Sequence, residues 1–150
     1  MNAYAYLIGW RVVRLLPEKV AYSLFFFIGD YVFKKNGKSI QKLRSNMQRV
    51  SGLQGPKLDA LTKEAMRSYM RYWCDTFRFP TWNPEDFIGR TTLVNGHYLD
   101  EALAEGKGAI VSLPHAGNWD HAGAYYCHVG HPVVTVAEHL EPEKLFQKFL

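Results

Sequence analysis

The feature that most constrains the fold of this chain is the stretch from Gly108 to Asp120. It opens with a short apolar run that predicts a buried strand, and Pro114 ends that strand. His115 follows directly, and a glycine-containing turn separates it from a helix that we expect to begin near Asn118. The stretch therefore predicts a histidine at the carboxyl end of a strand, beside the first turn of a helix.

The sequence around this stretch alternates between strand and helix patterns. In chain order the prediction is strand 91–94, helix 98–105, strand 109–113, helix 118–128, strand 132–137 and a helix from 141 onward. Such alternation is typical of βαβ units, whose strands run parallel. We therefore expect an α/β fold in which residues 89–150 begin a mostly parallel sheet with flanking helices. The last helix pattern carries no stop signal, so we expect this sheet domain to be incomplete.

Residues 1–88 show a helical period instead of an alternating one. Apolar residues recur at steps of three and four, which predicts helices at 2–15, 17–33, 39–50 and about 58–77. Residues 1–50 carry nine Lys and Arg against two acidic residues, a net charge of +7, whereas the remaining residues have a net charge of −3. A basic, aromatic-rich half indicates an anionic partner surface, and without a nucleic-acid-binding motif we favour a bilayer over nucleic acid.

The aromatic cluster of the second predicted helix leaves two interpretations open. The longest apolar run, 20–29, has about 10 residues, whereas a helix needs about 20 to cross a bilayer. Phe25, Phe26 and Phe27 could therefore pack as ordinary core or lie in the bilayer interface. The helical half is accordingly interpreted as facing a membrane rather than crossing it.

Other kinds of site find little support in the sequence. Cys74 and Cys127 lie far apart in helical patterns, which predicts two buried, reduced thiols in a cytosolic protein. The histidines lack the H-E-x-x-H spacing, so no metal site is predicted. Ser112 lies inside a predicted strand and no G-x-S-x-G is present, so a serine triad is not supported.

The junction between strand and helix is where we expect chemistry, since open α/β sheets bind ligands beyond the carboxyl ends of their strands. Asp120 could accept the Nδ1–H of His115 and leave Nε2 as a general base. Gly117 would let a substrate approach the backbone, and the N–H groups that start the helix could meet an oxyanion or a phosphate. The structural alternative is that Asp120 only complements the helix dipole and Asn118 only caps the helix.

The run His115-Ala-Gly-Asn-Trp-Asp120 resembles the H-x4-D motif of glycerolipid and lipid A type acyltransferases. Residues 94–115 are similar to that family's strand–glycine–helix–Gly-Lys-Gly–strand–histidine run, and 44–50 and 71–78 are similar to its amino-terminal helical part. The resemblance covers most of the chain. Gly-Asn-Trp after the histidine is similar to the branch that holds lipid A late acyltransferases and actinobacterial phosphatidylinositol mannoside acyltransferases. Pro114 and Asp120 make the chain more similar to the actinobacterial enzymes.

This resemblance implies an acyl-CoA-dependent enzyme that moves a palmitoyl-type chain to a mannose hydroxyl of phosphatidylinositol mannosides. It implies catalytic roles for His115 and Asp120 and substrate contacts for His115, Gly117, Asn118 and Trp119. Acyl-CoA would be a co-substrate, with no resident cofactor and no metal. The acceptor lipid and an anionic bilayer would be its partners, and the enzyme would be peripheral to the cytosolic face of the inner membrane.

Members of the family run to about twice this length, and the resemblance implies a glutamate beyond residue 150 as partner of His115. Three alternatives stay open beside the mannoside acyltransferase. One is a lipid A type, Kdo-linked late acyltransferase, and another is a non-catalytic membrane-binding fragment of the same scaffold. The third is an esterase or thioesterase in which His115 activates water.

Overall fold

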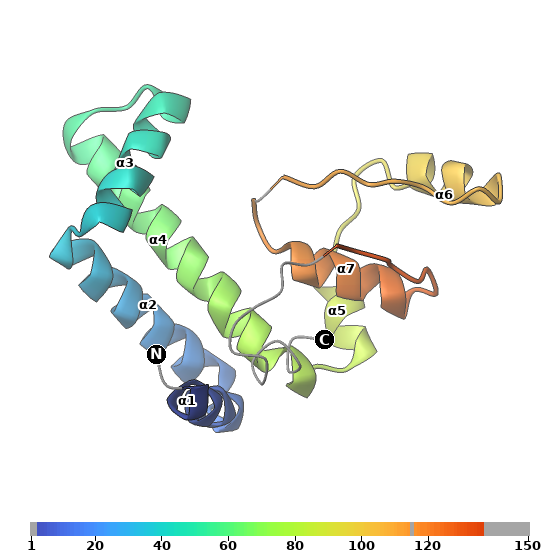
Figure 1. Cartoon of the computed structure of the whole chain (residues 1–150), viewed down its shortest axis with the longest axis horizontal. Helices are drawn as coiled ribbons and strands as arrows, with labels where there is room; N and C mark the ends of the chain where they lie inside the picture. The colour runs from blue at the N-terminus through green and yellow to red at the C-terminus, as the bar shows by residue number, and fades with distance from the viewer. Residues whose placement is uncertain (1–2, 115, 137–150) are drawn as a thin grey trace. The chain divides into compact units, whose positions relative to one another are not determined.

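The structure, a computed structural model, describes residues 3–114 and 116–136, with side chains described from Ile8 onward. The described chain forms two compact units that divide between Thr81 and Trp82. Long helices make up the first unit, and shorter helices joined by extended segments make up the second (Figure 1). The helix predicted from 141 onward lies outside the described residues.

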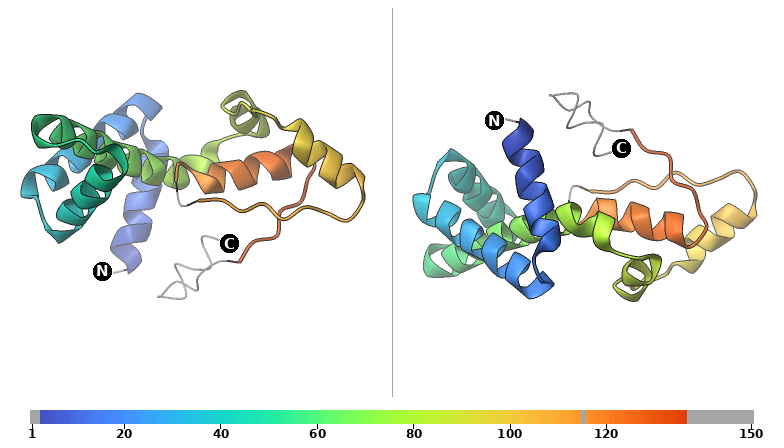
Figure 2. Two further views of the ribbon diagram at one scale, coloured as in Figure 1. Left: turned by 90° about the horizontal axis from the view of Figure 1, so that it is seen from above. Right: turned by 90° about the horizontal axis from the view of Figure 1, so that it is seen from below.

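The first unit consists of α1 (Ala3–Leu15), α2 (Glu18–Lys35), α3 (Lys38–Ser51) and α4 (Gly55–Arg78), followed by the 3₁₀ turn η1 (Phe79–Thr81). These helices confirm the helical periodicity predicted for this part of the sequence. Helix α4 is the centre of the unit, because α1, α2 and α3 all pack against it (Figure 2). Helices α2 and α4 have the most extensive contact.

Local sequence signals set the ends of these helices. Asn36 ends α2 and Gly52 ends α3, both in the left-handed conformation, with φ of 45° and 69°. Pro56 lies in the first turn of α4, where its missing N–H removes no helical hydrogen bond. The connections are only a few residues long, and α3 and α4 are the consecutive helices that pack on one another.

The core of the first unit lies between α1, α2 and α4. It is built around Val13, Ala21, Phe25 and Cys74. Gly29 lets α2 approach α4 closely, because a Cβ at this position would lie 3.1 Å from Cγ of Met70. The question left open for Phe25 is answered here: its ring is buried and meets the ring of Phe77 edge-on.

A buried arginine joins α1 to the end of α4. Nη1 of Arg78 donates to the carbonyl oxygens of Val13 and Leu16, at 3.2 and 2.7 Å. Nε1 of Trp10 adds a 2.8 Å hydrogen bond to the carbonyl oxygen of Phe77. The last carbonyls of a helix have no partner within it, so Arg78 satisfies groups that α1 itself leaves open.

Ion pairs on the surface link the neighbouring helices to α4. Arg67 donates through Nε and Nη2 to the two carboxylate oxygens of Asp30, at 2.8 Å each, and Nζ of Lys63 lies 3.3 Å from Asp30. The hydrogen bond from Arg67 is the main reason that the pKa of Asp30 is lowered. Arg44 of α3 forms an ion pair with Asp59 of α4 through Nη1.

The outward faces of α1 and α2 are apolar. We call this set the outer stripe; its side chains are 42–84% exposed and comprise Ile8, Val12, Leu15, Val20, Leu24, Phe27 and Tyr31. They recur at steps of three and four, so on each helix they share one face. Within the described residues, no helix combines the length and the hydrophobicity that crossing a membrane would need.

The second unit contains α5 (Pro84–Gly89), α6 (His97–Ala104) and α7 (Trp119–His128). Helices α6 and α7 were predicted, whereas α5 was not. Asn83 starts α5 through a reciprocal capping box: its Oδ1 accepts the N–H of Asp86 at 2.9 Å, and the Asp86 carboxylate accepts the N–H of Asn83 at 3.0 Å.

The predicted α/β fold is wrong for the residues that the structure describes. None of them lies in a strand, so the expected parallel sheet is not formed, and 91–94, 109–113 and 132–136 are irregular or extended. Apolar, β-branched sequence predicts an extended backbone, but a strand also needs a neighbour to exchange backbone hydrogen bonds. Ile110, Val134 and Val136 are instead 98–102% exposed.

Candidate active site

The candidate active site is the backbone turn that joins Pro114 to α7. His115 itself lies outside the described residues, so its role as a base stays a prediction. The N–H of Ala116 donates to the carbonyl oxygen of Pro114 at 2.7 Å, and Gly117 has φ of 69°. A Cβ on Gly117 would meet nothing within 4 Å, so the left-handed conformation and not crowding favours glycine here.

Asn118 caps α7, as predicted. Its Oδ1 accepts the N–H of His121 at 3.0 Å and so satisfies one of the open donors of the first turn. Its Nδ2 is buried and has no hydrogen-bond partner in the described part of the chain. A buried donor left unsatisfied is destabilising, and capping does not explain it, so the amide group is available for a further partner.

Trp119 and Asp120 form the first turn of α7 and are both partly buried. The carboxylate of Asp120 lies where the helix dipole favours negative charge, which supports the structural alternative for this residue. Its pairing with His115 stays a prediction, as do the substrate contacts of Gly117, Asn118 and Trp119.

His121, for which no role was predicted, holds α7 against α5. The hydroxyl of Thr91 donates to the carbonyl oxygen of Phe87 at 2.9 Å, so towards Nε2 of His121, at 3.0 Å, it can only accept. His121 therefore carries its proton on Nε2. The rings of Trp82 and Phe87 lie beside the imidazole, with centroid distances of 5.8 and 5.4 Å.

The position of His121 matters because it lies three residues after Asn118, in the turn that starts α7. Its contacts with α5 and Thr91 fix the beginning of the helix that follows the motif. One local signal could have shown this packing partner: Asn83-Pro84-Glu85-Asp86 has the spacing of a capping box.

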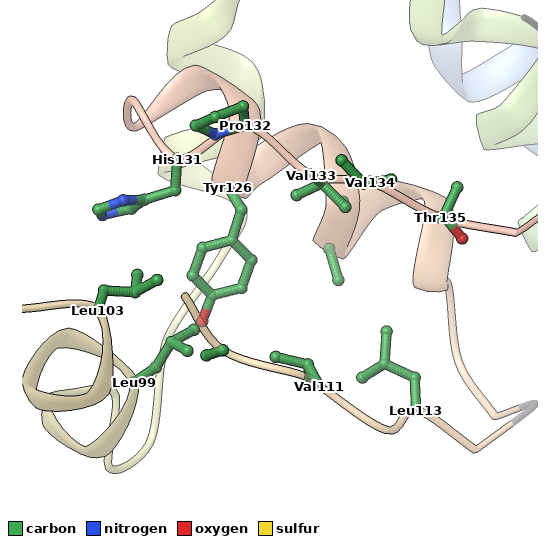
Figure 3. Close-up of a pocket in the computed structure, with 13 residues that line it drawn as sticks. Leu99, Leu103, Val111, Leu113, Tyr126, His131, Pro132, Val133, Val134 and Thr135 are labelled. Atoms are coloured by element: carbon green, nitrogen blue, oxygen red, sulfur yellow. The ribbon is translucent and has the colours of Figure 1, made fainter. Parts of the chain in front are cut away.

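An open, mostly apolar pocket of about 240 Å³ lies beside the motif, between α6, α7 and two extended segments (Figure 3). Ala109, Val111 and Leu113 line it at alternating positions, so one side of this extended segment faces the pocket. Leu113 is two residues before His115 in the sequence, so the lining of the pocket extends to the residues next to the motif. Helices α6 and α7 and residues 131–135 supply the other walls: Leu99, Leu103, Ala122, Gly123, Tyr126, His131, Pro132, Val133, Val134 and Thr135.

The two cysteines differ from each other. Burial raises the pKa of the Cys74 thiol to about 12. Cys127 is exposed, so the prediction of two buried thiols is wrong for it. Helix α7 has no fully buried residue, so a helical position there does not imply burial. Among the described residues, no group of three or more His, Cys, Asp or Glu side chains could hold a metal ion.

Comparison with known proteins identifies the family. The family model for bacterial lipid A biosynthesis acyltransferases matches residues 1–150. The chain belongs to the bacterial lipid A biosynthesis acyltransferase family. Two similar proteins are phosphatidylinositol mannoside acyltransferases. The one from Mycobacterium tuberculosis is 39% identical over 150 residues, which cover 98% of this chain and 47% of the relative. The one from Mycolicibacterium smegmatis is 36% identical over 146 residues, 97% of this chain and 47% of the relative.

The chain thus spans about half the length of the curated relatives it matches. Membership of the lipid A biosynthesis acyltransferase family confirms the resemblance found around the H-x4-D motif. In this member of the family, the pocket-lining residues Ala109, Val111 and Leu113 come directly before the motif in sequence, and the capped start of α7 comes directly after His115-Ala-Gly.

Proposed function

We propose that this protein transfers a fatty acyl chain from acyl-CoA to a mannose hydroxyl of phosphatidylinositol mannosides. The family and the names of the two relatives support acyl transfer to a glycolipid. The observation that carries the proposal is the apolar pocket whose lining extends to the residues next to the motif, because such an enzyme must hold an alkyl chain beside its base. The enzyme needs no cofactor beyond acyl-CoA as co-substrate.

In the proposed reaction, His115 removes the proton of a mannose hydroxyl as the hydroxyl oxygen attacks the thioester carbonyl carbon. A carbon–oxygen bond forms, the carbon–sulfur bond breaks, and coenzyme A leaves as a thiolate that takes up the proton from His115. Backbone N–H groups at the start of α7 stabilise the negative charge that develops on the carbonyl oxygen. Asp120 orients the imidazole of His115.

We also propose that the first unit binds an anionic bilayer and keeps the enzyme peripheral to the cytosolic face of the inner membrane. The outer stripe offers apolar side chains, and α1 and α2 add the exposed basic residues Arg11, Lys19, Lys34 and Lys35. Apolar side chains insert at the interface, and each basic side chain near anionic lipid contributes about 1 kcal/mol.

A transfer assay tests the reaction. Purified protein is mixed with radiolabelled palmitoyl-CoA and vesicles that contain phosphatidylinositol mannoside, and labelled acceptor is measured. We expect His115→Ala to lower the rate by about 10²–10⁴-fold, because a positioned base contributes that much. His97→Ala is the matched control, since His97 is an exposed histidine of α6 outside the pocket, and it should leave the rate unchanged. Equal rates for wild type and His115→Ala would contradict the proposal.

The description of the family favours a second acceptor, a Kdo-linked lipid A precursor. The same assay with that precursor separates the two, because transfer to only one of them assigns the acceptor. Release of labelled fatty acid to water without an acceptor would indicate a thioesterase. Vesicle binding with neither transfer nor release would indicate a non-catalytic membrane-binding protein.

A further inference from the structure

Tyr126 projects from α7 across the pocket (Figure 3). In that view its hydroxyl lies next to Leu99 of α6. Val111 and Leu113 lie on the side of the ring from which the chain continues to the motif, and Leu103 and His131 lie on the other side. The ring therefore divides the pocket into a part near the motif and a part farther from it.

The part near the motif suits an alkyl chain. On this side Figure 3 shows the apolar side chains of Val111, Leu113, Val133 and Val134, together with Thr135. Beyond the ring the lining includes the imidazole of His131. The Tyr126 hydroxyl is itself neutral, because burial, followed by the neighbouring Tyr125 and Asp100, raises its pKa. An alkyl chain that enters from the motif meets apolar groups, apart from the hydroxyl of Thr135, until it reaches this ring.

We propose that Tyr126 is the specificity-determining residue that limits the length of the acyl chain, with its ring as the floor of the chain-binding part of the pocket. This inference rests on the proposed function, because it takes the ligand to be the acyl chain of the thioester donor. A chain that ends at the ring buries all its methylenes. A longer chain has to displace the ring or leave methylenes in water.

A larger residue at Gly123 should have the opposite effect to removal of the Tyr126 ring, because it should shorten the chain that the pocket accepts. Gly123 lies on α7 three residues before Tyr126, so both residues face the pocket from the same side of the helix. A Cβ on Gly123 would meet nothing within 4 Å. A larger side chain there would extend into the pocket on the motif side of the ring and would shorten the space for the chain.

The test is a binding series with saturated acyl-CoAs from octanoyl- to stearoyl-CoA, measured by displacement of a fluorescent fatty acid from the full chain. For wild type, affinity should rise by about fourfold per methylene and then level off at a limiting length. Tyr126→Ala should move that limit to longer chains and Gly123→Leu to shorter ones. The matched controls Tyr126→Phe and Gly123→Ala keep the ring and the space, so both should leave the limit in place.

An unchanged limit in folded Tyr126→Ala and Gly123→Leu, judged by circular dichroism, would overturn the inference, as would the absence of a limit in wild type. If Tyr126→Ala fails to fold, Tyr126→Leu shortens the side chain and keeps it apolar, and the same shift is expected. The binding series contains no acceptor. If the limiting chain length shifts in the variants but no acyl transfer is found, only the proposed function is contradicted. If transfer is found but the limiting chain length does not shift, only the role of Tyr126 is contradicted.

Discussion

Single residues of the same type have very different surroundings in this protein. Phe25 and Phe27 are two positions apart on α2, yet their exposed fractions are 5% and 71%. The sequence could not distinguish them, because both lie in one uninterrupted aromatic run. The structure therefore divides the run between the core and the outer stripe. The two thiols also differ in burial, since Cys74 is buried and Cys127 is exposed.

Cys127 is expected to react with a thiol reagent in the native protein, and Cys74 is not. Burial raises the pKa of Cys74 to about 12, and the thiolate is the reactive form. The assay uses Ellman's reagent at a pH near 8.5, about the pKa of an ordinary thiol. Native protein should release one equivalent of the coloured thiolate quickly, and a second equivalent only in denaturant. Cys127→Ser should abolish the fast phase. Equal reactivity of both thiols without denaturant would show that Cys74 is not buried.

At the candidate site, the predictability of a residue follows the distance to its partner along the chain. Asn118 was predicted as a cap because its partner, the N–H of His121, is three residues away. The anchoring role of His121 was not predicted, because it depends on Thr91, thirty residues earlier. Local signals thus located the start of α7 but not what holds it.

Helices and strands also differ in how well the sequence predicts them, because their hydrogen-bond partners lie at different distances along the chain. Helices α1–α4 were predicted because helical hydrogen bonds are local and the apolar period shows directly in the sequence. Strands depend on a distant partner, so the extended segments 109–113 and 132–136 were taken for strands of a sheet that the described residues do not form. Helix α5 was missed although its signal, the capping box of Asn83 and Asp86, is local.

The contact between α2 and α4 should weaken in acid. The pKa of Asp30 is lowered in the folded protein, chiefly by the hydrogen bond from Arg67. Its stabilising effect is therefore complete above the unfolded pKa, about 3.9, and is lost as pH falls through the lower folded pKa. Asp30→Asn should lower the urea midpoint slightly at neutral pH, because the pair is partly exposed.

The curves of midpoint against pH for wild type and Asp30→Asn should then converge at acid pH. Glu101→Gln, an exposed position of α6, is the control and should run parallel to wild type. A constant difference between wild type and Asp30→Asn across the whole acid range would contradict the role of the ion pair.

For the whole molecule, the residues of the motif and its flanks predicted the family correctly, whereas the periodicity of apolar residues did not predict the fold class correctly. The motif and its flanks indicated the acyltransferase family, which the comparison confirmed, while the α/β architecture inferred from periodicity was wrong for the described residues. The uneven charge of the chain adds an expectation about surfaces: the basic first half should prefer anionic lipid.

Phe27→Ser should weaken binding to anionic vesicles by roughly 10- to 100-fold, because a buried phenylalanine side chain contributes about 1.5–3 kcal/mol. Its effect on the unfolding midpoint should be small, since Phe27 is 71% exposed. Co-sedimentation with phosphatidylglycerol vesicles measures the binding. Tyr69→Ser is the control: Tyr69 is 52% exposed on α4, outside the outer stripe, and the change should leave binding intact. Equal losses in both variants would rule out a specific role for the stripe.

The hydrogen bonds of Arg78 have a consequence for how the first unit opens. The terminal helix of a chain usually frays first, because little ties it down. Here α1 cannot separate from α4 without removing two carbonyl acceptors from the guanidinium of Arg78, a residue that is only 8% exposed. An uncompensated buried charge is strongly unfavourable. Amide protons near the end of α1 should therefore share the slow exchange of those in α4, so that the two helices open as one cooperative unit.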